Sequence, residues 1–243
     1  MGRVVTFAEA RAERAADGVA QAPITQGETR EMAAEFVRVE PGKRWSAAVP
    51  HGSDCYLFML SGTGSIAAGD GSHRFPTQTF ATIQEGVAFV LDNDGQAPAE
   101  IVKVLAPPRP GGLAGFRDRI SVAQRVEVPV VDLPDQKKKR IYFVGDHGAK
   151  SARGHAMIVV YGKDTVTDLH HHPNAESMFV ILDGALTFTV NGERVLVQPG
   201  QAAYFGINDQ HGLHTAEGCS GASFLEFHIP AAFTTVKAAK PAG

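Results

Sequence analysis

The sequence is poor in cysteine and in long apolar runs, and each shortage excludes a class of protein. Cys55 and Cys219 are its two cysteines, and neither lies in a CxxC or other metal-binding spacing. This usage excludes a disulfide framework and favours a reducing compartment. No stretch approaches the roughly 18 consecutive apolar residues of a membrane-spanning helix. Because Glu9 and Glu13 also argue against a targeting peptide, we expect a cytoplasmic protein with no membrane partner.

The chain has no excess of basic charge. It carries 23 Lys and Arg against 26 Asp and Glu, for a formal net charge of −3. A nucleic-acid binder usually presents a strongly basic face, so we expect no nucleic-acid partner. The one basic run, KKKR at residues 137–140, lies close to Asp132 and Asp135 and is typical of a solvated connector. With 44% hydrophobic residues, the 243-residue chain is long enough to bury a sizeable core.

Short β-branched and aromatic runs, separated by Gly, Asn and Asp, dominate the chain from Met32 onward. Such runs predict an all-β sandwich or barrel. The segment APPRPGG at residues 106–112 interrupts them and predicts a linker. We expect short helices over residues 7–17, which are rich in Ala, Glu and Arg, and over residues 113–126.

The two β-rich halves match each other at a constant offset of 122 residues. Residues 60–62, LSG, align with residues 182–184, LDG, and residues 80–93 align with residues 202–215. A fixed offset of this size indicates a duplicated domain. The expected organisation is an extension at residues 1–29, a first barrel at 30–106, a partly helical linker at 107–150 and a second barrel at 151–236.

Histidine carries the chemical signal. Of ten histidines, five fall in the two clusters HHHPNAE, residues 170–176, and HGLH, residues 211–214. Side chains alternate along a strand, so His170 and His172 point the same way, and His211 and Glu176 can join them from neighbouring positions. Such a set suits a first-row divalent metal with open coordination positions. The alternatives are satisfied core histidines or a solvated loop.

These motifs resemble those of the cupin superfamily, and the duplication makes the chain similar to a bicupin. The resemblance covers nearly all of residues 30–105 and 155–230 and implies two tandem double-stranded β-helix (jelly-roll) barrels. It assigns one divalent metal, with Fe(II) or Mn(II) favoured and Ni, Zn or Cu as alternatives, to His170, His172, Glu176 and His211. The matching positions are Gly162, His170, His172, Glu176 and Gly184 in the first motif, and Gly200, Gly206, Asn208, His211 and Thr215 in the second.

One departure from the family pattern concerns Glu176. Seven residues separate Glu176 from Gly184 where the family usually has six. An extra residue reverses the side-chain parity of a strand unless a β-bulge absorbs it. Glu176 is therefore the least secure of the four expected ligands.

The first half does not keep the metal motif. At the same offset, Ala48, Pro50, Asp54 and Phe89 replace the four expected ligands. We expect no metal there, and we interpret the remaining pair of His51 and Asp54 as structural.

The resemblance implies a metal-dependent enzyme, of the non-haem dioxygenase type, that acts on a small organic substrate. Glu176 would bind the metal or take a proton, and His214 would act as an acid or base if its strand bulges. His155 and His228 are candidate supporting donors, and Phe179 and Tyr204 are candidate wall residues. The alternatives are a non-redox isomerase, lyase or hydrolase, and a non-catalytic small-molecule binder.

Two expectations concern the substrate and the assembly. No Arg or Lys falls within the metal motifs, which disfavours a strongly anionic substrate unless Arg194 or Lys163 reaches in from a loop. The resemblance also implies a homodimer.

Overall fold

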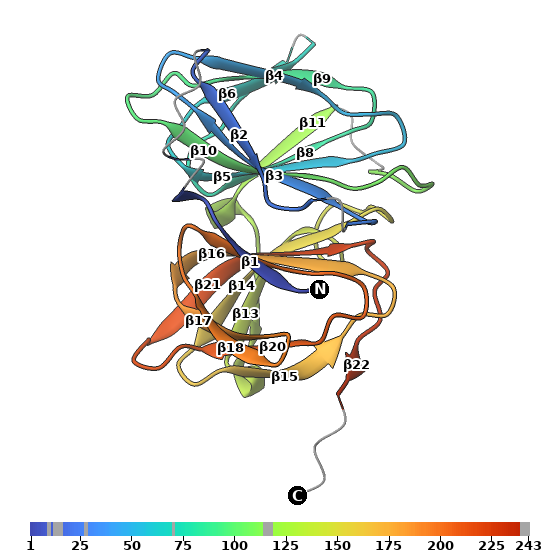
Figure 1. Cartoon of the computed structure of the whole chain (residues 1–243). Coiled ribbons are helices and arrows are strands. Elements are labelled where there is room, and N and C mark those ends of the chain that lie inside the picture. The colour runs from blue at the N-terminus through green and yellow to red at the C-terminus, as the bar shows by residue number, and fades with distance from the viewer. Residues whose placement is uncertain (9–10, 12–16, 27–28, 70, 114–118, 239–243) are drawn as a thin grey trace, which may run out of the picture.

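The chain folds into two jelly-roll barrels that pack against each other through one sheet of each (Figure 1). The computed structural model describes residues 1–8, 11, 17–26, 29–69, 71–113 and 119–238. The first barrel contains β2 (Val19–Pro23), β3 (Ala33–Val39), β4 (Arg44–Ala48), β5 (Cys55–Ser61), β6 (Ser65–Ala68), β7 (Gly71–Arg74), β8 (Thr79–Ile83), β9 (Ala88–Asp92), β10 (Ala99–Leu105) and β11 (Ile120–Gln124).

The second barrel repeats this order and adds strands at its edges. It contains β1 (Arg3–Thr6), β12 (Val130–Leu133), β13 (Lys138–Val144), β14 (His155–Gly162), β15 (Val166–His171), β16 (Glu176–Gly184), β17 (Leu186–Val190), β18 (Glu193–Val197), β19 (Gln201–Phe205), β20 (His211–Thr215), β21 (Gly221–Ile229) and β22 (Val236–Lys237). Two short 3-10 helices, η1 (Arg125–Glu127) and η2 (Pro134–Gln136), lie between the barrels in sequence.

Each barrel consists of a large and a small antiparallel sheet. In the first barrel the strand orders are β11-β8-β5-β10-β3-β2 and β4-β9-β6-β7. In the second they are β1-β19-β16-β21-β14-β13-β12 and β18-β17-β20-β15-β22. The all-β, two-barrel prediction is confirmed, and the repeat extends to detail: the strand pairing slips at Leu60 in β5 and at Leu182 in β16, which are 122 residues apart.

The barrels exchange edge strands. β1 precedes the first barrel but pairs with β19 of the second, whereas β11 precedes the second barrel but pairs with β8 of the first. Figure 1 shows the dark blue β1 against the second barrel, whose colours run from yellow-green to red. The segments expected as an extension and a linker therefore contain strands of both barrels.

The helix expectations fare differently. Most of the helix expected over residues 7–17 lies outside the described residues. The helix expected over residues 113–126 is wrong for Ile120–Gln124, which forms β11, although η1 follows directly. In the described part of the chain, no helix is long and apolar enough to cross a membrane.

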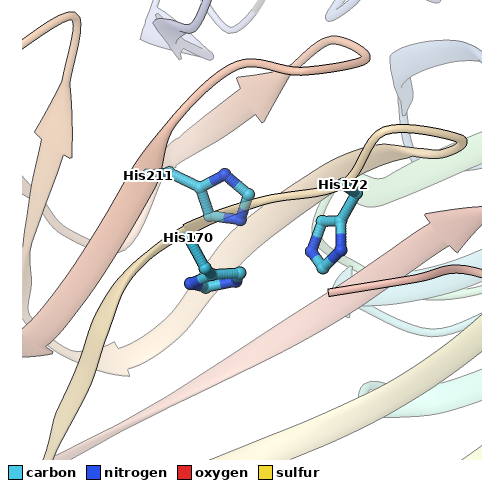
Figure 2. A group of neighbouring side chains, drawn as sticks. All are labelled: His170, His172 and His211. Atoms are coloured by element: carbon cyan, nitrogen blue, oxygen red, sulfur yellow. The ribbon is translucent and has the colours of Figure 1, made fainter. Parts of the chain in front are cut away.

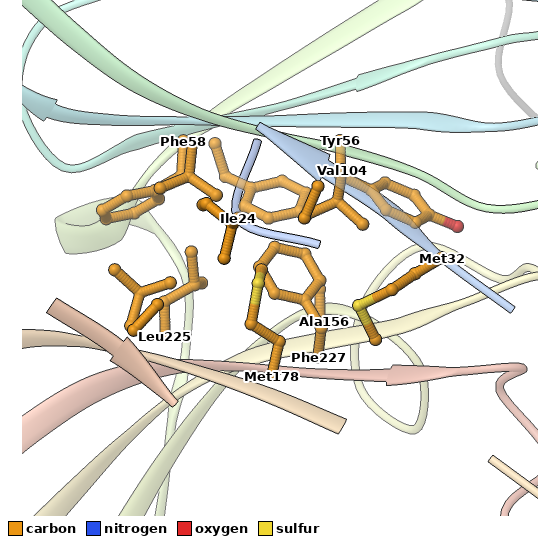
Figure 3. Packing of buried hydrophobic residues seen from close by; sticks show 14 of the residues in the cluster. Ile24, Met32, Tyr56, Phe58, Val104, Ala156, Met178, Leu225 and Phe227 are labelled. Atoms are coloured by element: carbon orange, nitrogen blue, oxygen red, sulfur yellow. The ribbon is translucent and has the colours of Figure 1, made fainter. Parts of the chain in front are cut away.

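Strand alternation divides the buried side chains into three cores. One core fills the interior of the first barrel, where Trp45 packs edge-on against Phe89 with 5.4 Å between the ring centroids. A second fills part of the interior of the second barrel. The third lies between the large sheets, where Tyr56 and Phe58 of the first barrel meet Met178, Leu225 and Phe227 of the second (Figure 3). Phe89, which matches His211 in the repeat, thus lies in an apolar interior.

Asp54 serves this interface between the barrels. Its carboxylate accepts hydrogen bonds from Arg153 Nη1 at 2.9 Å, Ser151 Oγ at 2.6 Å and Tyr56 OH at 3.2 Å. His51, by contrast, is exposed. The structural interpretation of Asp54 is therefore supported by its contacts, since it ties the first barrel to residues that precede β14.

Candidate metal centre and its cavity

Three histidines converge inside the second barrel. His170 lies near the end of β15, His172 follows that strand, and His211 begins β20, where it pairs directly with His170. All three are buried, and one ring nitrogen from each lies within 4.8 Å of the other two. Figure 2 shows the rings turned toward a common centre. The structure therefore brings together the three histidines that the sequence selected.

Backbone carbonyls fix the tautomer of each ring. The Nδ1 atoms of His170, His172 and His211 lie 2.7, 2.9 and 3.0 Å from the carbonyl oxygens of Asp168, Thr234 and Asp209. A carbonyl only accepts, so each Nδ1 carries the proton and each Nε2 keeps its lone pair.

The Nε2 atoms are the ones left for a metal. Those of His172 and His211 are buried without a hydrogen-bond partner in the described structure. A buried polar atom without a partner is costly, and metal-binding histidines commonly donate their other ring N–H to a carbonyl. This donor set fits one divalent transition metal.

Burial also keeps the three imidazoles neutral. It lowers the pKa of His211 to about 3 and of His172 to about 4, with neighbouring histidines as a further cause. Burial lowers the pKa of His170 as well. Because only a neutral imidazole binds a metal, these rings are ready to do so at neutral pH.

Glu176 does not join them, and its assignment as a ligand or proton acceptor is wrong. Its Oε1 accepts the backbone N–H of Arg30 at 2.7 Å, and its Oε2 accepts that of Met32 at 3.0 Å. Burial raises the pKa of Glu176, and these hydrogen bonds oppose that shift. Its side chain belongs to the face of β16 that points toward the first barrel.

The position of the bulge explains this orientation. The pairing of β16 with β21 is regular from Glu176 to Ile181 and slips only at Leu182. Glu176 therefore shares a face with Met178, which lies in the core between the barrels, and Ser177 faces the interior. Tyr204, expected in the cavity wall, also lies in that core.

His214 is also wrong as a catalytic residue. β20 pairs with β17 from His211 to Thr215 without a slip, so no bulge turns His214 inward. Its Nδ1 lies 3.0 Å from the carbonyl oxygen of Thr215, and it does not line the cavity.

A cavity of about 890 Å³ opens beside the histidines. His170 and His172 form part of its wall, and Phe179, Leu213 and Phe233 contribute apolar surface. A cavity of this size accommodates a small organic molecule.

A hydrogen-bonded chain of three side chains reaches the cavity, where His228 and Glu226 line the wall and Ser177 lies buried behind His228. Ser177 Oγ lies 2.9 Å from His228 Nδ1, and His228 Nε2 lies 2.6 Å from Glu226 Oε1. The His228 ring is 4.9 Å from that of His172, centroid to centroid. Although burial works to raise it, the hydrogen bond with His228 lowers the pKa of Glu226 to about 2. Glu226 is thus a carboxylate at neutral pH.

His155 lines the same cavity. Burial, helped by the neighbouring His228, lowers its pKa to about 4. The sequence left open whether His155 and His228 face the cavity or serve the core or the surface, and in the structure both line the cavity.

Sequence reasoning missed Lys138, Arg140 and Tyr142. All three line the cavity, because the basic run continues directly into β13 and every second side chain of that strand points inward. The signal was available in the sequence, because the basic residues 138–140 run directly into the β-forming residues Ile, Tyr, Phe and Val at 141–144.

Comparison with known proteins agrees with this geometry. Residues 157–227 of the second barrel match the sequence model of the cupin domain. E. coli Ylba superimposes with a TM-score of 0.74 at 10% identity, covering 94% of this chain and 90% of that one. The chain has the fold of a bicupin.

Other solved structures share the bicupin fold at low sequence identity. A cupin 2 conserved barrel domain protein from Leptotrichia buccalis gives a TM-score of 0.68 at 15% identity, covering 93% of this chain and 96% of that one. A Bacillus subtilis oxalate decarboxylase gives 0.70 at 14%, covering 96% and 78%. At such identities the likeness establishes fold alone. No curated protein matches this chain in sequence.

Proposed function

We propose that this bicupin is a metal-dependent enzyme that acts on a small organic substrate. One divalent metal per chain, with Fe(II) or Mn(II) favoured over Ni, Zn or Cu, would be held by His170, His172 and His211. The observation that carries this proposal is the pair of buried Nε2 atoms of His172 and His211 that no described group satisfies.

Within this proposal we favour a dioxygenase-type reaction. A metal held by only three protein ligands keeps open positions and, when bound, supplies Lewis acidity and redox chemistry toward substrate and O₂. The chain's own contribution is to orient the imidazoles through their carbonyl partners and to exclude water. Phe179, Leu213 and Phe233 supply the apolar wall that does so.

A non-redox reaction is the second candidate, and the chain of Ser177, His228 and Glu226 favours it. A serine hydroxyl, an imidazole and a carboxylate in hydrogen-bond contact can pass a proton to or from a substrate. Such acid–base groups are what an isomerase, lyase or hydrolase needs beside its metal.

Metal content tests the first step of this proposal. Untagged wild-type protein is expected to bind one equivalent of metal, and the double variant His170→Ala/His211→Ala none. His214→Ala is the matched control, because His214 lies on the same strand as His211 but outside the cavity. Equal metal content in a folded double variant would refute the site.

Reaction type requires a second experiment. Metal-free protein is loaded anaerobically with Fe(II) and mixed with catechols or β-diketones in an oxygen electrode. Oxygen uptake that tracks product formation supports a dioxygenase, and turnover without oxygen supports the non-redox candidate. Tight binding without turnover would make the protein a binder.

The cytoplasmic location and the homodimer stay predictions. Light scattering on the purified protein measures its oligomeric state.

A further inference from the structure

Two cationic side chains stand next to each other in the cavity wall. Lys138 and Arg140 are both half-buried on β13 and point into the cavity. Lys139, between them, points outward with 55% of its side chain exposed and lies 3.5 Å from the carboxylate of Asp132. The strand therefore separates one solvated charge from two that face the cavity.

In the described structure no carboxylate lies within ion-pair distance of either cation, although Glu226 is near enough to raise the pKa of both. Arg140 Nη1 donates to Tyr142 OH at 3.2 Å, and Arg140 Nε is buried without a hydrogen-bond partner in the described structure. Lys138 Nζ donates to Thr167 Oγ1 at 2.7 Å and lies 4.9 Å from the centroid of the Tyr161 ring. Among the described residues, neither cation forms an ion pair.

Two like charges on one face repel each other and lose hydration, so their placement needs compensation. Burial and the adjacent Arg140 together lower the pKa of Lys138. An anion bound between the two side chains would offset both costs.

The net charge of the cavity wall limits how much negative charge the bound anion can carry. Glu226 is the only carboxylate of the cavity wall that is not exposed in the described structure, and it is held by His228. Lys138, Arg140 and Glu226 together leave one net positive charge. The remaining charged lining residues are exposed, so solvent screens them, although Asp168 still works to raise the pKa of Lys138. They are Asp135, Lys137, Asp146, Asp164, Asp168 and Lys237.

We propose that Lys138 and Arg140 bind the carboxylate of a small monoanionic organic substrate inside the cavity that His170 and His172 also line. The planar guanidinium suits a carboxylate, and aromatic neighbours such as Tyr142 and Phe179 suit an apolar body attached to it. A phosphate dianion would exceed the available positive charge and be repelled by Glu226. The assignment of this carboxylate as a substrate group rests on the proposed function, whereas anion binding itself does not.

The test uses calorimetry to measure how metal-free protein binds benzoate, its neutral isostere benzamide, and inorganic phosphate. We expect benzoate to bind, with an affinity that falls as salt is raised, and benzamide and phosphate to bind at least about 10-fold more weakly, as loss of a charge-assisted hydrogen bond or of charge balance requires. Absence of benzoate binding, or tighter binding of phosphate, would overturn the proposal.

Three variants locate the site. Arg140→Met and Lys138→Met each remove one cavity-facing charge while keeping the apolar stem, and each should weaken benzoate binding by about 10-fold or more. Lys139→Met changes the net charge by the same amount outside the cavity and should bind benzoate like wild type. Equal losses in all three, or none in the first two, would contradict the assignment. Unfolding curves identify any variant that fails to fold. If one of the two cavity variants does not fold, benzoate binding by the other variant tests the assignment.

The double variant His170→Ala/His211→Ala separates this inference from the proposed function. It should lose metal yet keep benzoate binding, because neither histidine supplies the positive charge. If wild type binds benzoate through Arg140 but never binds metal, the proposed function fails and the anion site stands. If wild type binds metal but not benzoate, the anion site fails and the proposed function stands.

Discussion

Glu176 and His211 are both buried in the second barrel, but their side chains have different roles. Glu176 accepts hydrogen bonds from the backbone of residues 30 and 32, whereas His211 belongs to the candidate metal centre. We predict that Glu176→Ala lowers the free energy of unfolding by about 2–5 kcal/mol, because two backbone N–H groups lose their acceptor. Metal content should stay at the wild-type value. Urea unfolding and elemental analysis measure both quantities, and Glu176→Gln, which keeps one carbonyl oxygen, should lose less stability. Loss of metal from folded Glu176→Gln would return the carboxylate to the ligand set.

His155 is expected to make the stability of the metal-free protein depend on pH. Burial lowers its folded-state pKa from 6.5 to about 4, so between these values the unfolded chain binds a proton that the folded chain does not. The contribution of His155 to the free energy of unfolding is therefore fully present above pH 6.5 and is lost as the pH falls toward 4. Its contribution to the difference between pH 7 and pH 5 is about 2 kcal/mol.

Chemical unfolding at the two pH values checks this. His155→Gln should reduce the pH-dependent loss of stability by that amount, whereas His51→Gln, at an exposed position of the other barrel, should leave it as in wild type. An unchanged loss in His155→Gln would contradict the expected neutral state of the buried ring.

At the site itself, the sequence allowed a correct prediction wherever strand alternation applied directly. His170 and His172 followed from a two-residue spacing, and the same rule raised the doubt about Glu176. It did not decide that doubt, because the place where a bulge absorbs an extra residue depends on the neighbouring strand. Arg140 was missed for another reason: charge density alone was weighed for residues 137–140, and the strand that begins there was not.

At the scale of elements, the β texture and the 122-residue offset were enough to predict two similar barrels. The offset relates strand to strand, as β8 (Thr79–Ile83) and β19 (Gln201–Phe205) show. The exchange of β1 and β11 was not predictable, because both are short edge strands whose partners lie far away in sequence. Their pairing is set by which sheet edge each segment can reach, which only the packed barrels define.

On the scale of the whole molecule, the shared core between the large sheets should make the barrels unfold together. Trp45, the only tryptophan, is buried inside the first barrel and reports on that barrel by fluorescence. Leu225 belongs to the second barrel but points into the core between them (Figure 3). A cavity at such a position typically costs about 2–5 kcal/mol.

We therefore predict that Leu225→Ala lowers the midpoint of the Trp45 fluorescence transition in urea as much as the midpoint followed by far-ultraviolet circular dichroism. The substitution leaves every contact of Trp45 intact, so only coupling across the shared core can transmit its effect to the first barrel. Leu196→Ala is the control, because Leu196 is also in the second barrel but is 54% exposed, and it should move neither midpoint. If Leu225→Ala splits unfolding into two steps and leaves the Trp45 midpoint unchanged, the barrels are independent folding units, and their common core orients them without stabilising the first.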